Sequence, residues 1–234
     1  MSLKNFLVLQ QGPESPVAES YRLLRAKLQL ALAQGVRTFC VVSAWGRDGK
    51  STVSLNLAHS FCQLCLKVTL VDCDLRKPTL TRVLGMQDRP GLTEFLRTGG
   101  DVAPLIYPTE VEYLSFLPAG RDLTGSADLL ARGNLPELFI QLGRSDSITV
   151  VDTSPLAACG DAYLLGPHTG AAVMVISPAH WQGEPEARFK EALEDHSFKV
   201  LGVVLNGSKD SEASYGYGYG YGYGYGPPRE KNGR

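Results

Sequence analysis

Apolar residues along this chain gather in short runs that are separated by longer amphipathic stretches. The runs that fit β-strands cover 37–43, 67–72, 112–117, 147–152, 171–177 and 199–205. Several are apolar at consecutive positions, which is typical of parallel strands buried on both faces. The amphipathic stretches predict helices at 50–64, near 79–84, at 91–98, 126–131, 135–142, near 161–165 and at 185–195. This alternation predicts an α/β fold with a doubly wound, mostly parallel sheet.

The amino-terminal region precedes this alternation. Residues 1–16 are interrupted by Gly and Pro, and we expect an irregular arm there. A helix should follow over 17–33, where leucines and alanines form a broad apolar surface. Glu19, Arg22 and Arg25 recur every three residues on its polar side. This stripe is either a solvated face or a contact surface.

The composition changes at Ser208 to Ser, Gly, Tyr, Pro and charged residues. Tyrosine then alternates with glycine, and the six tyrosines are Tyr215, Tyr217, Tyr219, Tyr221, Tyr223 and Tyr225. Because glycine at every second position makes ordering entropically costly, we expect 208–234 to be a disordered tail. The chain thus divides into the arm at 1–16, one folded domain at 17–207 and the tail.

Charge and length exclude several classes of protein. The chain has 234 residues, a formal net charge of -1 and a pI near 6.4. This balance argues against bulk electrostatic binding to nucleic acid or anionic lipid. The sequence has no signal-peptide pattern at its start, and no apolar run approaches the roughly 18 residues that cross a bilayer. We therefore expect a cytoplasmic protein without a nucleic-acid partner.

The five cysteines are an odd number, and most lie in apolar segments. Buried reduced thiols are the simplest interpretation. Cys62 and Cys65 have the spacing of half a zinc or redox site, but no second cysteine pair or nearby histidine completes it. A metal or redox role for them is the weaker hypothesis.

A phosphate-binding loop is the clearest chemical signal. Ser43 to Thr52 read Ser-Ala-Trp-Gly-Arg-Asp-Gly-Lys-Ser-Thr between a predicted strand and a predicted helix, which is the context of a P-loop. Backbone N–H groups would surround the phosphates of ATP, Lys50 would balance their charge, and Ser51 would ligate Mg²⁺. The predicted nucleotide contacts are Gly46, Arg47, Asp48, Gly49, Lys50, Ser51 and Thr52. The alternative is a tight surface turn capped by Ser51.

Two further predicted strands end in carboxylates. Asp72 and Asp74 follow the strand at 67–72 with a spacing of two, so both side chains should lean to one side and share a metal or divide its roles. The plainer alternative is a helix-capping turn before Pro78. Asp152 ends the strand at 147–152 and fits the role of a Walker B acid, which orients Mg²⁺.

These motifs occur in one order, and with them the chain resembles the bacterial tyrosine autokinases, the P-loop kinases of capsule and exopolysaccharide export systems. The resemblance rests on the P-loop, on Val71-Asp72-Cys73-Asp74-Leu75-Arg76, on Val151-Asp152-Thr153-Ser154-Pro155 and on the tyrosine tail. It implies a P-loop NTPase fold of the MinD and ParA branch. It also implies transfer of the γ-phosphoryl group of ATP to tyrosine, first on the tail of a neighbouring subunit.

The resemblance also implies roles for single residues. Lys50 and Mg²⁺ would stabilise the transferring group, with the metal ligands drawn from Ser51, Asp72 and Asp152. Asp72 is favoured as general base toward the phenol and Asp74 as a support for the metal or the lysine, although the two roles are exchangeable. By resemblance Asn206 would face the adenine. Ala44, Arg47 and Ser154 depart from the usual motifs and could lower activity without changing the class.

Partners follow from the same resemblance. Glu19, Arg22 and Arg25 match an element that joins subunits of the family into a ring, so a homo-oligomer is expected, with an octamer as one candidate. The chain resembles the split arrangement, in which a separate membrane-anchored polysaccharide co-polymerase supplies an activating segment. That partner would recruit the kinase to the inner face of the membrane, with polysaccharide-synthesis enzymes as candidate substrates. Phosphates on the tail are expected to favour dissociation of the ring, because their charges repel.

Two other classes share parts of the pattern. A partitioning or positioning ATPase of the MinD and ParA type has the same fold and motif order. Those proteins, however, carry a signature Lys where this chain has Trp45, and they lack a tyrosine tail. A nucleotide-dependent scaffold would instead use the Tyr-Gly repeat as an assembly tract. Phosphate transfer to the tail distinguishes the kinase from both.

Overall fold

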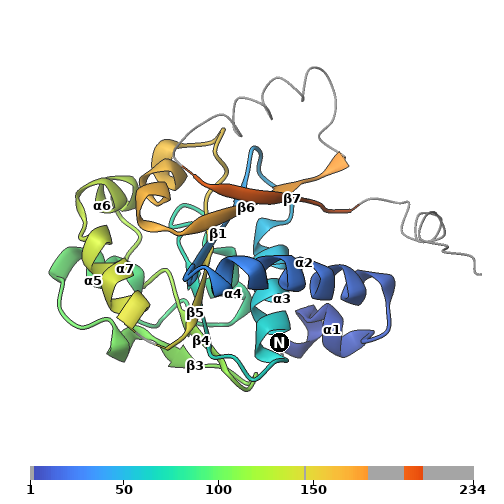
Figure 1. Ribbon diagram of the computed structural model, residues 1–234. Coiled ribbons are helices and arrows are strands. Elements are labelled where there is room, and N and C mark those ends of the chain that lie inside the picture. The colour runs from blue at the N-terminus through green and yellow to red at the C-terminus, as the bar shows by residue number, and fades with distance from the viewer. Residues whose placement is uncertain (1–2, 145, 179–197, 208–234) are drawn as a thin grey trace, which may run out of the picture.

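The structure is a computed structural model that describes residues 3–144, 146–178 and 198–207 (Figure 1). Within them one sheet has the strand order β3-β4-β2-β5-β1-β6-β7. The parallel strands are β1 (Thr38–Ser43), β2 (Val68–Asp72), β4 (Leu114–Leu117), β5 (Ile148–Asp152), β6 (Ala171–Ile176) and β7 (Val200–Leu205). β3 (Tyr107–Pro108) pairs antiparallel with β4. The predicted α/β fold is confirmed, and β3 was missed because two residues form no periodic pattern.

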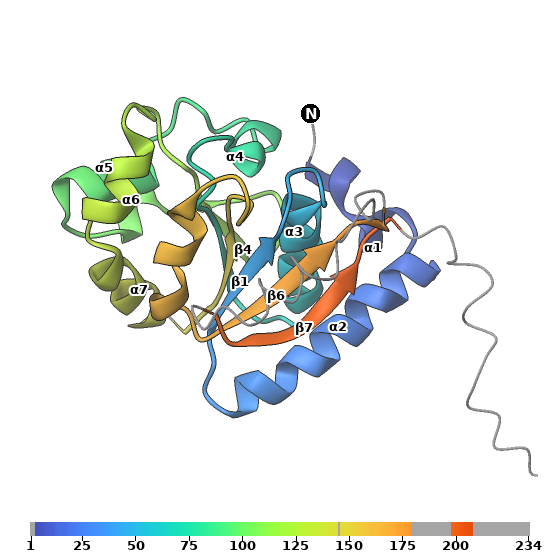
Figure 2. The same cartoon turned by 90° about the horizontal axis from the view of Figure 1, so that it is seen from above.

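Helices cover both faces of the sheet (Figures 1 and 2). They are α1 (Val8–Gln11), α2 (Pro16–Ala33), α3 (Lys50–Cys62), α4 (Thr79–Val83), α5 (Leu92–Thr98), α6 (Ser126–Arg132) and α7 (Leu135–Arg144), with 3-10 turns at Leu3–Phe6, Ala103–Leu105, Gly160–Leu164 and Gly166–His168. One buried cluster lies under α2 and α3 and includes Phe39 and Phe61. The other lies under α5 and α7 and includes Phe95 and Phe139. The helix expected at 185–195 lies outside the described residues.

The amino-terminal segment differs from the prediction. Residues 3–11 form a 3-10 turn and α1 rather than an irregular arm. Leu3, Leu7 and Leu9 are buried in the core beneath α2 and α3. The backbone N–H of Val8 donates to Asn56 Oδ1 on α3 at 2.8 Å. The segment is ordered by these long-range contacts, which local Gly and Pro content does not reveal.

Parallel pairing brings the motif residues to one edge of the sheet. β1, β2 and β5 are neighbours, and their carboxyl ends lie together. Asp72 and Asp152 occupy the same register position on β2 and β5. The sites predicted at separate strand ends therefore form one region, as expected for a doubly wound sheet.

No helix in the described parts of the chain is long and apolar enough to cross a membrane.

Candidate active site

The phosphate-binding loop connects the end of β1 to the start of α3. Gly49, the last residue before the helix, has φ 92°, which is the left-handed region. A Cβ atom there would lie 2.0 Å from Asn206 Nδ2. That amide nitrogen donates a 2.8 Å hydrogen bond to the carbonyl of Asp48. Position 49 therefore requires glycine both for its backbone conformation and for the close approach of Asn206.

Other contacts hold the loop from within. Asp48 is buried and accepts a 3.1 Å hydrogen bond at Oδ2 from the backbone N–H of Trp45. Ser43 Oγ donates to the carbonyl of Trp45 at 2.6 Å. Arg47 is exposed and also has a positive φ, of 70°, which explains why related loops favour glycine there. The departure at Arg47 is accommodated because its side chain is exposed to solvent.

Lys50 is buried at the first position of α3. Its Nζ donates to Ser43 Oγ at 3.0 Å. Burial lowers the pKa of the Lys50 amine, and the nearby carboxylates of Asp152, Asp74 and Asp48 oppose that shift. Among the described residues this ammonium group contacts one neutral hydroxyl and has no direct ion pair, so a phosphate group is a suitable counter-charge.

Asp152 lies fully buried where β5 ends. Its Oδ1 accepts a 3.0 Å hydrogen bond from Ser54 Oγ, whereas Oδ2 has no hydrogen-bond partner among the described residues. Burial raises the pKa of Asp152 to about 6, and the side chain of Ser51, the charge of Lys50 and the Ser54 hydroxyl oppose the rise. A buried carboxylate oxygen without a donor is costly, so a cation would satisfy it.

The donor set fits magnesium. Ser51 and Asp152 supply hydroxyl and carboxylate oxygens, which are the ligands that Mg²⁺ prefers. No group of three or more His, Cys, Asp or Glu side chains that could hold a metal occurs in the described parts of the chain. Magnesium commonly uses one or two protein carboxylates and takes its other ligands from phosphates and water. The incomplete Cys62 and Cys65 pair gains no further ligand from the described residues.

Asp72 and Asp74 face different surroundings. Asp72 is fully buried, and its Oδ2 accepts two 2.8 Å hydrogen bonds, from the N–H and from the hydroxyl of Thr81. Asp74 lies beyond the end of β2, is partly exposed and lines the cavity beside the P-loop. The spacing-of-two argument fails for Asp74, because the extended backbone stops at Asp72. Burial and the neighbouring Asp152 raise the pKa of Asp72, and burial raises that of Asp74.

The cavity beside the P-loop has a volume of about 500 Å³. Its lining includes Gly46, Arg47, Gly49, Lys50, Ser51, Thr52, Asp74, Arg76, Lys77 and Ser154. Arg76 forms a forked ion pair with Asp161, with Nε to Oδ2 at 2.6 Å and a terminal nitrogen to Oδ1 at 3.2 Å. A larger cavity of about 980 Å³ lies at the opposite edge of the sheet, near Lys67 and Ser147. The smaller cavity is the candidate site because the phosphate-binding and acidic motifs converge on it.

Sequence reasoning missed several residues of this site. Ser54 lies three positions after Ser51, so helical spacing could have placed it on the same face of α3. Thr81 belongs to no motif, and Asp161 reaches Arg76 from a segment 85 positions away in the sequence. Ser43 marks only the start of the loop in the motif, yet it is the hydrogen-bond partner of Lys50.

The predicted oligomerisation residues do not form one free stripe. Arg22 pairs with Glu19 at 3.0 Å and donates to the carbonyl of Pro13 at 2.5 Å. Arg25 instead turns toward α3, where its NH1 donates to the carbonyl of Ser60 at 2.5 Å. Burial lowers the pKa of the Arg25 guanidinium. The tail tyrosines from Tyr215 to Tyr225 lie outside the described residues.

Comparison with known proteins identifies the family. Residues 35–141 match the ParA family model, described as a NUBPL iron-transfer P-loop NTPase. Over 209 residues the chain is 34% identical to tyrosine-protein kinase YwqD of Bacillus subtilis, covering 89% of this chain and 88% of that protein. The chain belongs to the bacterial tyrosine-protein kinases. It also shares 30% identity with tyrosine-protein kinase ptk of Acinetobacter johnsonii, over 91% of this chain but only 29% of that longer protein.

Solved structures agree with a tyrosine kinase fold. The chimerical protein CapA2B2 superposes with a TM-score of 0.75 at 28% identity, covering 88% of this chain and 91% of the other. The kinase domain of the Escherichia coli tyrosine kinase ETK superposes with a TM-score of 0.75 at 25% identity, covering 86% of this chain and 80% of the other. MinD from Pyrococcus horikoshii, complexed with Mg-ADP, superposes with a TM-score of 0.58 at 25% identity, covering 72% of this chain and 69% of the other. The kinase thus has a P-loop NTPase fold related to MinD, as the motifs predicted.

Proposed function

We propose that this kinase transfers the γ-phosphoryl group of ATP to the tyrosines of its own tail, in trans between neighbouring subunits of a ring. The observation that carries the proposal is that Lys50, Ser51 and Asp74 line one cavity beside a phosphate-binding loop, while the buried charge of Asp152 acts on Lys50. The alternating Tyr-Gly segment supplies the acceptor hydroxyls. Its glycine-rich composition and length suit it to reaching an adjacent subunit.

Positioning and charge would supply most of the catalysis. The P-loop N–H groups and the start of α3 bind the phosphates of the substrate ATP, and Lys50 balances their charge. Ser51 and Asp152 would hold Mg²⁺, which would neutralise charge on the transferring group. Asn206 keeps the loop in its binding conformation through the carbonyl of Asp48, and we assign it contact with the adenine as a further role.

Asp72, the last residue of β2, and Asp74, just beyond it, have different proposed roles. Asp74 lines the cavity, so we assign it to accept the phenolic proton of the incoming tyrosine. Burial raises its pKa, which makes it a better proton acceptor than an ordinary aspartate. Asp72 is buried next to Asp152 and belongs to the metal side of the site. This assignment exchanges the roles first favoured from the sequence.

The cellular role is proposed from the family resemblance rather than from the site. We infer that tail phosphorylation regulates synthesis and export of capsule or exopolysaccharide, with a separate membrane-anchored partner as activator and recruiter. Polysaccharide-synthesis enzymes are the candidate further substrates. CapA2B2, whose fold this chain shares, is a chimerical protein, in keeping with a kinase that works with a second protein.

Mass spectrometry of the full chain tests the activity. The protein is incubated with Mg²⁺ and ATP, with and without the cytoplasmic segment of a candidate activator, and its intact mass and tail peptides are measured. Successive phosphates on Tyr215 to Tyr225 are expected. Lys50→Met should abolish them, whereas Lys67→Met, an exposed lysine outside the P-loop cavity, should not. ATP hydrolysis with an unmodified tail in both conditions would refute the proposal.

The oligomeric state gives an independent test. Each tyrosine phosphate adds nearly two negative charges at neutral pH, so six of them close together repel strongly. Native mass measurement should show a ring for the unphosphorylated chain and smaller species after phosphorylation. An unchanged oligomeric mass would contradict the dissociation mechanism while leaving the kinase activity intact.

A further inference from the structure

A buried chain of hydrogen bonds ends on Asp72. The N–H of Ala119, just after β4, donates to Thr81 Oγ1 at 2.9 Å. Thr81 Oγ1 donates in turn to Asp72 Oδ2 at 2.8 Å. All three residues are essentially inaccessible to solvent. Because the Ala119 N–H occupies an acceptor position of the hydroxyl, the hydroxyl hydrogen is directed toward the carboxylate.

The two oxygens of Asp72 are held very differently. Oδ2 receives both the N–H and the O–H of Thr81, each at 2.8 Å. From the described residues, Oδ1 receives only a 3.3 Å contact from the N–H of Asp74. One oxygen is therefore saturated by donors, and the other retains acceptor capacity. These contacts hold the Asp72 carboxylate in one orientation, in which Oδ1 can accept a further contact.

The end of this hydrogen-bond chain that lies away from Asp72, at Ala119, is anchored on α5. Pro118 and Ala119 carbonyls accept hydrogen bonds from the N–H groups of Leu92 and Thr93 at 2.8 and 2.9 Å. Gly91 lies against this turn so closely that a Cβ atom would meet the carbonyl of Pro118 at 2.1 Å. The Ala119 peptide is thus fixed by both its neighbours and its own hydrogen bonds.

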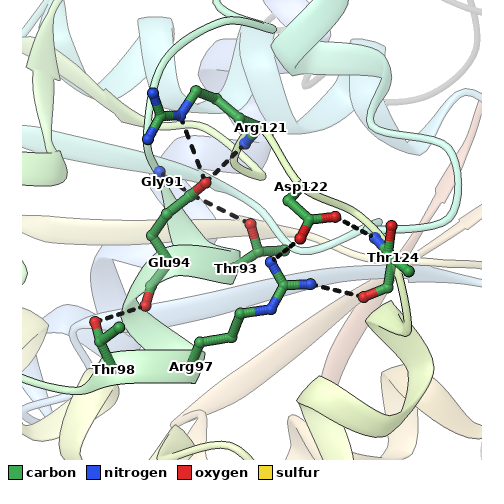
Figure 3. A network of polar contacts seen from close by, with 8 residues as sticks. All are labelled: Gly91, Thr93, Glu94, Arg97, Thr98, Arg121, Asp122 and Thr124. Carbon is green, nitrogen blue, oxygen red and sulfur yellow. Dashed lines mark hydrogen bonds and ion pairs between the residues drawn. The ribbon is translucent and has the colours of Figure 1, made fainter.

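A polar network extends the anchor (Figure 3). Glu94 accepts from the N–H of Gly91 at 2.7 Å and from the N–H of Arg121 at 3.2 Å. Arg97 pairs with Asp122 at 2.7 Å and donates to the carbonyl of Thr124 at 2.7 Å. The turn after β4 is therefore attached to α5 along its whole length, which keeps the Ala119 N–H aimed at Thr81.

We propose that Thr81 is a positioning residue of the kinase: its hydroxyl, oriented by the N–H of Ala119, fixes Asp72 so that Oδ1 faces the reaction. The inference rests on the proposed function, in which Asp72 lies on the metal side of the active site. The rival account is structural, because the N–H of Thr81 places Asp72 as a cap on the first turn of α4. Removing the hydroxyl alone separates the two accounts, since the capping N–H remains.

Thr81→Val and Thr81→Ser are the matched test. Valine has a similar shape without the hydroxyl, and serine retains the hydroxyl. For Thr81→Val we expect the maximal rate of tail phosphorylation to fall about tenfold to a hundredfold, the effect of losing a hydrogen bond to a charged group. The ATP concentration for half-maximal rate should change less than about threefold, and Thr81→Ser should stay within about threefold of the wild type in both.

Amide hydrogen exchange, measured without nucleotide or metal, supplies a readout besides activity. Loss of its acceptor should speed exchange at Ala119 in Thr81→Val but not in Thr81→Ser. If the valine variant does not fold, Thr81→Ala replaces it. A valine variant with the wild-type rate, or a serine variant as slow as valine, would overturn the inference. A wild type that transfers no phosphate to tyrosine would overturn the proposed function itself.

Discussion

Gly49→Ala offers a sharp test of the P-loop geometry. The residue has φ 92°, and a Cβ atom would lie 2.0 Å from Asn206 Nδ2. The substituted chain must therefore strain its backbone and also displace the Asn206 amide. Displacement breaks the 2.8 Å hydrogen bond from Asn206 to the carbonyl of Asp48. Both effects lower the free energy of unfolding.

The magnitude can be assembled from three costs and one offset. A left-handed conformation costs a residue with a Cβ atom about 1–2 kcal/mol. The overlap with Asn206 adds about 1–3 kcal/mol, and the lost hydrogen bond about 1 kcal/mol. Alanine offsets about 0.5–1 kcal/mol by restricting the unfolded chain. Gly49→Ala should thus lower the free energy of unfolding by about 2–5 kcal/mol.

A double-mutant cycle isolates the overlap. Asn206→Ala alone should destabilise the protein by about 1 kcal/mol, because only the hydrogen bond is lost. In the Gly49→Ala background the same change removes the overlap, so it should raise stability by about 1–3 kcal/mol. Urea unfolding of the four chains without nucleotide measures this reversal of sign. If Asn206→Ala is destabilising in both backgrounds by the same amount, the close approach of Asn206 to the P-loop is wrong.

Two further predictions concern other parts of the fold. Leu7→Ala should reduce the free energy of unfolding by about 2–5 kcal/mol, because Leu7 is fully buried; a loss below about 0.5 kcal/mol in urea unfolding would mean that the amino-terminal segment is not docked. Burial lowers the pKa of His59, so below about pH 6.5 the unfolded chain binds a proton that the folded chain excludes. The free energy of unfolding should therefore decrease as the pH is lowered through that range. Unfolding at pH 7.5 and 5.5 should show a smaller fall for His59→Gln, and equal falls would contradict this.

Much of the site was predictable because its signals are local. The P-loop is ten consecutive residues between a strand and a helix, and Asp152 ends a continuous apolar run. Parallel strands place their carboxyl ends at one edge, so the convergence of these motifs followed from the predicted fold class. Their order along the chain also pointed to the tyrosine kinase family, which the 34% identity to YwqD supports.

Other features depended on where distant segments meet. Residues 3–11 looked irregular in isolation and became helical against α3. Arg25 looked like part of a surface stripe, yet it reaches the carbonyl of Ser60. Thr81 had no motif at all. The contacts of Val8 with Asn56, of Arg25 with Ser60 and of Thr81 with Ala119 join residues far apart in sequence, so their free energy exists only once the chain has folded.

The sequence by itself thus determined the alternating strands and helices, the phosphate-binding loop and the order of the acidic residues, because apolar periodicity and glycine conformation act within a few positions. Only the tertiary structure decided how Asp72 and Asp74, at the end of β2 and just beyond it, differ. Asp72 is buried against Thr81, whereas Asp74 faces the cavity, since β2 ends between them. A two-residue spacing cannot encode that difference, because it arises from which neighbours the sheet and α4 bring to each oxygen.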